Sequence, residues 1–307
     1  MILVTGATGQ IGRHLVQELR TRKISFRAMV RHESARAALE TKGIKTVPGD
    51  FNQPSTFVPA LAGVKEVFLL TTPSPDQVLL EGEFLAAAVK AGVHRVVRLS
   101  AMGANPHSAS PLLQLHGLCE TQVQDSGIDW TILRPTMFMQ NLAPMYGATV
   151  SATSTFYAPA GDACIPLVDT RDVAAVAATV LAGKGHEWLT YEITGPDAHT
   201  YAGIAEILGV LLGRGIQFVD VPDDAAYKSM TDMGMTGWFA HCIITLFHYF
   251  RANGGTALAL GTVPRLTGRP ARTLTAYLQE NLEAFRKPGS TAPATGYKVA
   301  EVPVKKT

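Results

Sequence analysis

The chain has 307 residues, of which 47% are hydrophobic and 17% charged, and its formal net charge is +2. This length fits one large α/β domain or one domain with a smaller lobe, and the charge gives no reason to expect a nucleic-acid or membrane partner. No apolar run is long enough to span a bilayer and residue 2 already lies in an expected core strand, so we expect a cytoplasmic protein.

The strongest motif lies in the first dozen residues. The apolar run at residues 1–4 predicts a buried strand, and Gly6, Gly9 and Gly12 predict a turn after it. Residues 11–20 predict an amphipathic helix. Such a turn directs backbone N–H groups outward at the positive end of a helix dipole, where a pyrophosphate binds. The spacing is Gly-x-x-Gly-x-x-Gly, not the standard Gly-x-Gly-x-x-Gly. The alternative is a glycine-rich turn that binds nothing. The expected cofactor contacts here are Gly6, Thr8, Gly9, Gln10, Ile11 and Gly12.

The second predicted strand, residues 25–31, ends in Arg31. In an NAD site an acidic residue at this position accepts from the ribose 2′-OH. A guanidinium instead offers a 2′-phosphate a forked pair of donors. We therefore expect NADP(H) as the cofactor with Arg31 as its chief 2′-phosphate contact; the alternative is a solvated arginine at a strand end.

A third strand is expected at residues 44–50 and a fourth at 64–70. Asp50 is expected either to accept from the adenine amino group or to cap a helix that begins at Pro54, and Phe51 to cover the adenine ring. The fourth strand opens into Thr71, Thr72 and Pro73, which we expect near the ribose and phosphates because ligands bind at the carboxyl ends of parallel strands.

A helix is expected at residues 76–91 and a fifth strand at 94–100. An apolar stripe on the helix predicts its core face, formed by Leu79, Leu80, Phe84, Leu85, Ala88 and Val89. The end of the fifth strand places Ser100, Ala101 and Met102 at the ligand-binding edge. Alternating strands and helices predict an α/β fold, a doubly wound parallel Rossmann sheet with right-handed crossovers.

The usual acid of a short-chain reductase is missing, because no tyrosine is followed by lysine four residues later. In the corresponding helix, His116 and Glu120 share one face, a spacing at which a carboxylate holds an imidazole or raises its pKa. We expect His116 with Ser100 to polarise the substrate. A histidine that only caps or packs is the alternative.

The second half begins with a sixth strand at residues 130–133, after which Pro135 fixes a turn. That turn places Met137 and Phe138 where nicotinamide and substrate pack, with Asn141 beside them; simple core filling by the methionine is the alternative. Residues 151–163 are expected to form a loop. Residues 169–181 predict a helix capped by Asp169 or Thr170 that returns to the cofactor domain.

A small lobe is expected from a strand at 186–193, a helix at 201–212 and a strand at 217–221. The aromatic stretch 238–250, which includes Trp238, is interpreted as a lid over an apolar substrate, or else as a dimer face. His241 and His248 share a helix face without a third ligand, and the three cysteines lack metal-ligand spacing, so we expect no metal and buried, reduced thiols. A last helix is expected at 274–285, followed by a tail.

Several of these segments together resemble the NmrA-like atypical short-chain dehydrogenase/reductase family. The resemblance rests on Val4-Thr-Gly-Ala-Thr-Gly-x-Ile-Gly12, the Arg-ended second strand, Gly49-Asp50, Leu99-Ser100, Ser126-Gly-Ile-Asp-Trp-Thr-Ile-Leu-Arg-Pro135 and Asp169-x-Arg-Asp172-Val-Ala, and extends to about Phe285. It implies NADPH-dependent reduction of quinones, dyes or phenolic ethers, or NADP-sensing regulation without turnover. The phenolic-ether branch uses a lysine at or beside the position of His116.

These observations predict three regions: an NADP-binding Rossmann domain (1–150, rejoined by 163–183), a small substrate lobe (184–287) and a tail (288–307). We expect an NADPH-dependent oxidoreductase that transfers hydride to a small conjugated or aromatic acceptor, because such acceptors spread the arriving charge and need less help from an acid. A binding protein that senses NADP(H) is the alternative. The protein is expected to be a monomer or homodimer.

Overall fold

The computed structural model describes residues 1–253 and 260–287. At its centre is a parallel sheet of seven strands in the order β3-β2-β1-β4-β5-β6-β8. The strand order runs outward from β1 in one direction and from β4 in the other, which is the doubly wound arrangement, so the predicted fold class is confirmed. The strands are β1 (Ile2–Val4), β2 (Phe26–Val30), β3 (Thr46–Pro48), β4 (Glu66–Leu69), β5 (Arg95–Leu99), β6 (Asp129–Pro135) and β8 (Leu189–Ile193).

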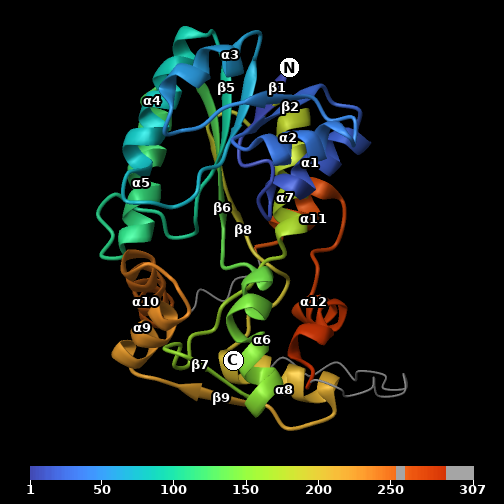
Figure 1. Ribbon diagram of the computed structural model, residues 1–307, viewed down its shortest axis with the longest axis vertical. Helices are drawn as coiled ribbons and strands as arrows, with labels where there is room; N and C mark the ends of the chain where they lie inside the picture. The colour runs from blue at the N-terminus through green and yellow to red at the C-terminus, as the bar shows by residue number, and fades with distance from the viewer. Residues whose placement is uncertain (254–259, 288–307) are drawn as a thin grey trace.

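Helices cover both faces of this sheet, and each face has its own apolar core. Figure 1 shows α3, α4 and α5 on one face and α1, α7 and α11 on the other. Leu15 and Val176 belong to the core on the α1 and α7 face, whereas Phe57 and Phe84 belong to the core on the α3 and α4 face. The helices around the sheet are α1 (Gly12–Thr21), α2 (Glu33–Glu40), η1 (Pro54–Thr56), α3 (Phe57–Leu61), α4 (Gln77–Lys90), α5 (Pro111–Gln124), α7 (Thr170–Ala182) and α11 (Thr262–Thr267).

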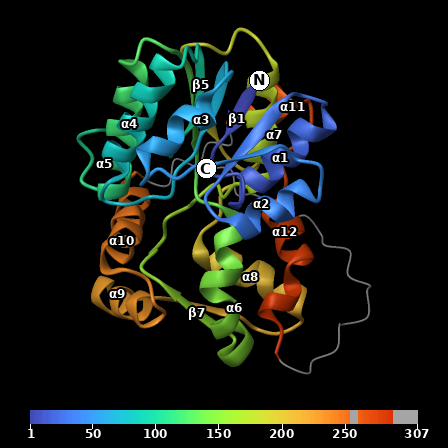
Figure 2. The same ribbon diagram turned by 45° about the horizontal axis from the view of Figure 1, so that its top comes forward.

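A smaller lobe with a separate apolar core lies on the side where β6 leads into α6 (Figures 1 and 2). It contains a two-stranded parallel sheet of β7 (Thr155–Ala158) and β9 (Gln217–Asp220). Its helices are η2 (Met139–Asn141), α6 (Leu142–Thr153), α8 (Tyr201–Leu212), α9 (Asp223–Asp232), α10 (Gly237–Ala252), α12 (Leu274–Glu280) and η3 (Leu282–Phe285).

Two predictions about the second half are wrong. Residues 151–163 are not one loop, because they contain the end of α6 and the strand β7. The strand expected at 186–193 lies not in the small lobe but in the central sheet, where β8 pairs with β6. The division into domains stays a prediction, with β8 assigned to the sheet. The predicted tail, 288–307, lies outside the described residues.

The expected apolar stripe on α4 is also wrong in part. Leu79 and Val89 are exposed, whereas the polar residues Gln77 and Glu81 are buried. The reason is Arg98 of β5, which is fully buried and forms an ion pair with Glu81, so α4 packs Gln77 and Glu81 against the sheet.

The predicted cap of α7 is confirmed, since the Asp169 side chain accepts a hydrogen bond from the Arg171 amide. Within the described ranges, no helix is long and apolar enough to cross a membrane.

Candidate active site

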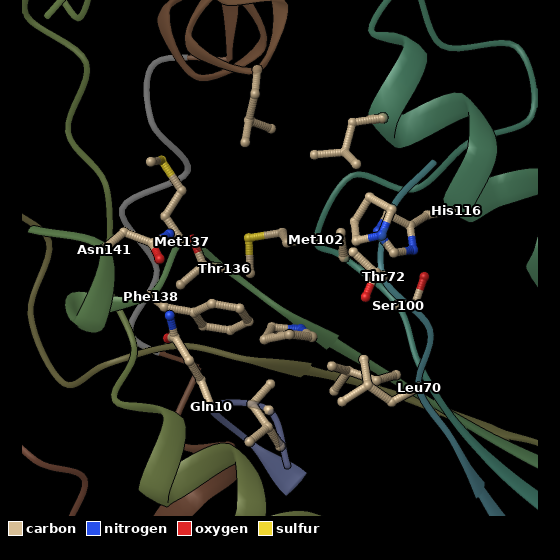
Figure 3. Close-up of a pocket in the computed structure, with 18 of the residues that line it drawn as sticks. Gln10, Leu70, Thr72, Ser100, Met102, His116, Thr136, Met137, Phe138 and Asn141 are labelled. Atoms are coloured by element: carbon tan, nitrogen blue, oxygen red, sulfur yellow. The ribbon is translucent and has the colours of Figure 1, made fainter. Parts of the chain in front are cut away.

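A pocket of about 530 Å³ opens at the carboxyl ends of four neighbouring strands. Its walls come from the segments that follow β1, β4, β5 and β6, and from side chains of α5 and α10. Figure 3 shows His116, Ser100 and Thr72 on one side of the pocket and Met137, Phe138 and Asn141 on the other. Because β1 and β4 flank the point where the strand order reverses, the pocket lies where doubly wound sheets bind their ligands.

The glycine turn after β1 has the geometry of a dinucleotide cradle. Gly6 has φ +61°, a conformation that glycine adopts without strain. A Cβ on Gly12 would lie 2.0 Å from the Gly6 carbonyl oxygen, so only glycine lets α1 start this close to the turn. Among the described residues no side chain caps α1, and its first turn holds no acidic residue. The start of the helix therefore remains favourable for an anion.

Most of the predicted cofactor contacts line the pocket. They are Gly6, Thr8, Gly9, Gln10, Ile11, Thr71, Thr72, Pro73, Ser100, Ala101 and Pro135. Gly12, Arg31, Asp50 and Phe51 lie outside the lining. A bound dinucleotide extends beyond its reactive ring, so Arg31, Asp50 and Phe51 stay predictions about the adenine end of the cofactor. Gly12 stays a prediction about its pyrophosphate.

Arg31 directly follows β2 and its side chain is exposed, with Nε donating to Nε2 of His32 at 3.0 Å. The Asp50 carboxylate accepts from the Asn52 amide at 3.0 Å and so closes a turn. Gln53, not Asp50, occupies the N-cap position of the helix at Pro54, and among the described residues no side-chain hydrogen bond caps this helix, so the capping alternative for Asp50 is wrong. Phe51 packs against Phe84 with ring centroids 5.1 Å apart.

The side of the pocket that we expect to bind the substrate is apolar and is closed by one face of α10. Met102, Met137, Phe138 and Asn141 line it as predicted, but Trp238 does not. Trp238 stacks instead on its neighbour Phe239, with centroids 6.3 Å apart. The α10 residues in the lining are Phe239, Ile243, Leu246 and Phe250. Their spacing of four, three and four residues marks one helical face, a signal present in the sequence.

Thr136 also lines the pocket and was not predicted. Only 4% of the residue is exposed, and its Oγ1 is buried without a hydrogen-bond partner among the described residues. A buried hydroxyl without a partner is costly, which makes this atom a candidate contact for a bound ligand.

The predicted contact between His116 and Glu120 is wrong. Glu120 instead accepts from Ser100 Oγ and from Nε and Nη2 of Arg134, with the Arg134 Nε at 2.9 Å. The Ser100 proton is therefore engaged with a carboxylate, so Ser100 has no proton to offer a substrate. His116 Nδ1 lies 3.4 Å from Nη2 of Arg98. Burial and, after it, the Arg98 charge lower the pKa of His116 to about 3, the opposite of the expected increase.

Behind this wall, Arg98 and Glu81 form a fully buried ion pair. Nε of Arg98 lies 2.8 Å from Oε2 of Glu81, and Oε1 of Glu81 also accepts from Thr71 and Gln77. Burial alone would raise the pKa of Glu81, but the Arg98 charge and these hydrogen bonds lower it below its usual range. The network thus connects the strand-end residue Thr71 to His116.

Comparisons with known proteins agree with this geometry. Residues 6–184 match the model of a family described as NAD(P)H-binding. An NAD(P)H azoreductase of Xenophilus azovorans is 38% identical over 285 residues, which cover 93% of this chain and 99% of that protein.

Two solved structures are similar over almost their whole length. The NADPH complex of a quinone oxidoreductase from Escherichia coli superposes with a TM-score of 0.84 at 26% identity, covering 92% of this chain and 100% of the other. The NADP(H) complex of a triphenylmethane reductase from Citrobacter superposes with a TM-score of 0.80 at 25% identity, covering 91% of this chain and 99% of the other.

Proposed function

We propose that this chain, which belongs to the NAD(P)H-binding family and is an oxidoreductase, uses NADPH to reduce a small conjugated acceptor such as a quinone, an azo compound or a cationic dye. One observation carries the choice of acceptor. The described lining contains no Asp, Glu, Lys or Arg, and its only histidine, His116, has a pKa of about 3. The pocket therefore offers no proton-donating acid near pH 7.

The acceptor class follows from this missing acid. When bound, the cofactor supplies a hydride, that is two electrons and one proton. An ordinary ketone that receives it becomes an alkoxide, and a positioned acid then contributes about 10²- to 10⁴-fold to the rate. A quinone or azo compound delocalises the arriving charge and takes its second hydrogen as a proton from water, whereas a cationic dye is neutralised by the hydride alone. These acceptors suit the pocket.

Binding of the two ligands is assigned to different residues. The turn from Gly6 to Gly12 would hold the pyrophosphate through backbone amides, and the exposed Arg31 would bind the 2′-phosphate through its forked donors. The apolar face of α10 would pack against the acceptor, with Thr136 as a hydrogen-bond partner for one of the ligands. The names of the related azoreductase, quinone oxidoreductase and triphenylmethane reductase support the same three acceptor types.

The test is NADPH oxidation by the purified protein with a panel of one quinone, one azo dye and one cationic triarylmethane dye. We expect turnover with at least one acceptor. Arg31→Ala should weaken NADPH binding about tenfold and change NADH binding far less, because the lost contact is to the 2′-phosphate. Lys228→Ala, an exposed cation on α9 paired with Asp232, is the matched control. NADPH binding without reduction of any acceptor would favour the NADP(H)-sensing alternative.

A further inference from the structure

We propose that Arg98 and Glu81 are positioning residues that fix the proton of His116 on Nε2, so that the imidazole offers the acceptor a hydrogen-bond donor and not an acid. His116 lines the pocket from α5, whereas Arg98 on β5 and Glu81 on α4 lie behind it. The part of the proposal that concerns the acceptor rests on the proposed function. The position of the proton does not.

The pair is rigid and fully enclosed. Arg98 has no exposed surface and Glu81 only 1%. Two guanidinium nitrogens reach the Glu81 carboxylate, Nε at 2.8 Å and Nη2 at 3.3 Å. Thr71 and Gln77 donate to the same carboxylate, so its orientation is fixed from three sides. The hydrogen bonds to Glu81 hold Nε and Nη2 of Arg98 and so keep the guanidinium beside His116, while Nη1 is buried without a partner among the described residues.

The guanidinium decides the tautomer of His116. Nη2 of Arg98 lies 3.4 Å from Nδ1 of the imidazole. Arginine has five N–H donors and no acceptor, so Nδ1 must be the accepting nitrogen in this contact. In a neutral imidazole the other nitrogen then carries the proton. His116 thereby has Nε2–H as its donor, on a ring that lines the pocket.

The surroundings of His116 keep the ring neutral. Burial and the Arg98 charge from β5 both lower its pKa, and the Glu81 charge from α4 opposes them only in part. On the same helix, Cys119 is held as a thiol because burial raises its pKa to about 12, and Glu120 is bound to Ser100 and Arg134. A second proton on Nδ1 would have to replace the contact with the guanidinium.

This arrangement distinguishes acceptors by the atom on which charge accumulates. A quinone oxygen or an azo nitrogen has a lone pair that can accept from Nε2–H as the hydride arrives, and water later supplies the proton. The central carbon of a cationic triarylmethane dye has no lone pair and gains only the hydride. A hydrogen bond to a developing anion corresponds to about a tenfold effect or more on rate.

The proton position can be measured without any substrate. In protein labelled with ¹⁵N-histidine, long-range ¹H–¹⁵N spectra distinguish the two neutral tautomers and the imidazolium, and His116→Gln identifies the signal. We expect His116 to be neutral, protonated on Nε2 and unchanged from pH 8 to pH 5. Protonation on Nδ1, or an imidazolium at pH 7, would overturn the proposal.

The positioning role is tested with a double variant, because breaking a buried pair on one side leaves an uncompensated charge. Glu81→Gln with Arg98→Met removes both charges and the donor to Nδ1. We expect both tautomers to become populated and the pKa of His116 to rise. The matched control is Glu66→Gln with Arg95→Met, which removes another buried arginine of β5 and one of its carboxylate partners, away from the pocket. An unchanged tautomer in the Arg98 variant would contradict the assignment.

Kinetics provide the second readout. In His116→Leu, which removes the donor, the ratio of quinone turnover to cationic-dye turnover should fall about tenfold, through kcat more than KM. In the Arg98 double variant the ratio should fall by a smaller factor, because part of the population keeps the proton on Nε2. The Arg95 control should keep the wild-type ratio. A ratio that is unchanged in His116→Leu overturns the donor role. If the wild-type protein reduces no acceptor at all, the proposed function fails while the spectra still decide the proton position.

Discussion

The half of the pocket proposed to bind the cofactor (the cofactor half) consists of strand-end turns, whereas the half proposed to bind the acceptor (the acceptor half) consists of side chains from α5, α10 and the segment after β6. The first half depends on close backbone approach, as at Gly12, where a Cβ would lie 2.0 Å from a carbonyl oxygen. The second depends on apolar side chains such as Ile243 and Phe239, which a different sequence could replace without moving the sheet. The cofactor half is therefore intolerant of change and the acceptor half adaptable.

The largest effect is expected where the cofactor half is most crowded. Gly12→Ala places a methyl group 2.0 Å from the Gly6 oxygen and 2.7 Å from the Ala7 Cα, so α1 must move away from the turn. A displacement of this kind should weaken NADPH binding about 100-fold, and overpacking should lower the free energy of unfolding by about 1–3 kcal/mol. Calorimetric titration and urea unfolding measure the two effects.

The control for Gly12→Ala is Gly215→Ala. Its Cβ would meet no described atom within 4 Å, and Gly215 lies in the small lobe, away from the described pocket lining. We expect unchanged NADPH binding in this variant. Equal losses at the two glycines would mean that the crowding at the turn has no special role.

A smaller effect, on the pH dependence of stability, is expected from His116, which lies between the two halves of the pocket and is held neutral. Its pKa is about 3 in the folded protein and about 6.5 in the unfolded chain. Below pH 6.5 the unfolded chain binds a proton that the folded protein does not, so stability falls as the pH falls. Between pH 7 and pH 5 this residue should lower the free energy of unfolding by about 2 kcal/mol.

Urea unfolding at the two pH values tests this expectation. His116→Gln should lose about 2 kcal/mol less stability than the wild-type protein on going from pH 7 to pH 5. His94→Gln, which removes an exposed histidine just before β5, should keep the wild-type difference. If His116→Gln behaves like the wild type, the folded protein takes up the proton and His116 is not held neutral.

The contrast between the halves also explains what the sequence could predict. The glycine turn and the strand-end segments are local patterns, so the parallel sheet and most of the pocket lining on the cofactor side could be predicted from them. The residue that contacts His116 could not be predicted in this way. Spacing on one helix favoured Glu120, but Arg98 and Arg134 come from other strands, and their pairing with Glu81 and Glu120 is decided by tertiary packing.

The same limit applied to Glu81 and Thr136. A glutamate within an apolar helix pattern is normally placed in solvent, and only the buried Arg98 reverses that expectation. Thr136 follows Pro135 at the end of β6, and nothing in the sequence indicates that its hydroxyl lacks a partner. On α10, by contrast, the spacing of the lining residues was present, but the most prominent aromatic residue drew the prediction to Trp238.

That choice provides the mildest test, because Trp238 and Phe239 are adjacent, partly buried and stacked, yet only Phe239 lines the pocket. Phe239→Ala should raise KM for an aromatic quinone about fivefold, the effect of losing one aromatic contact, and leave NADPH affinity unchanged. Trp238→Ala is the matched control and should raise KM less. Steady-state kinetics with both variants decide the point, since a larger effect from Trp238→Ala would place the acceptor on the other side of α10.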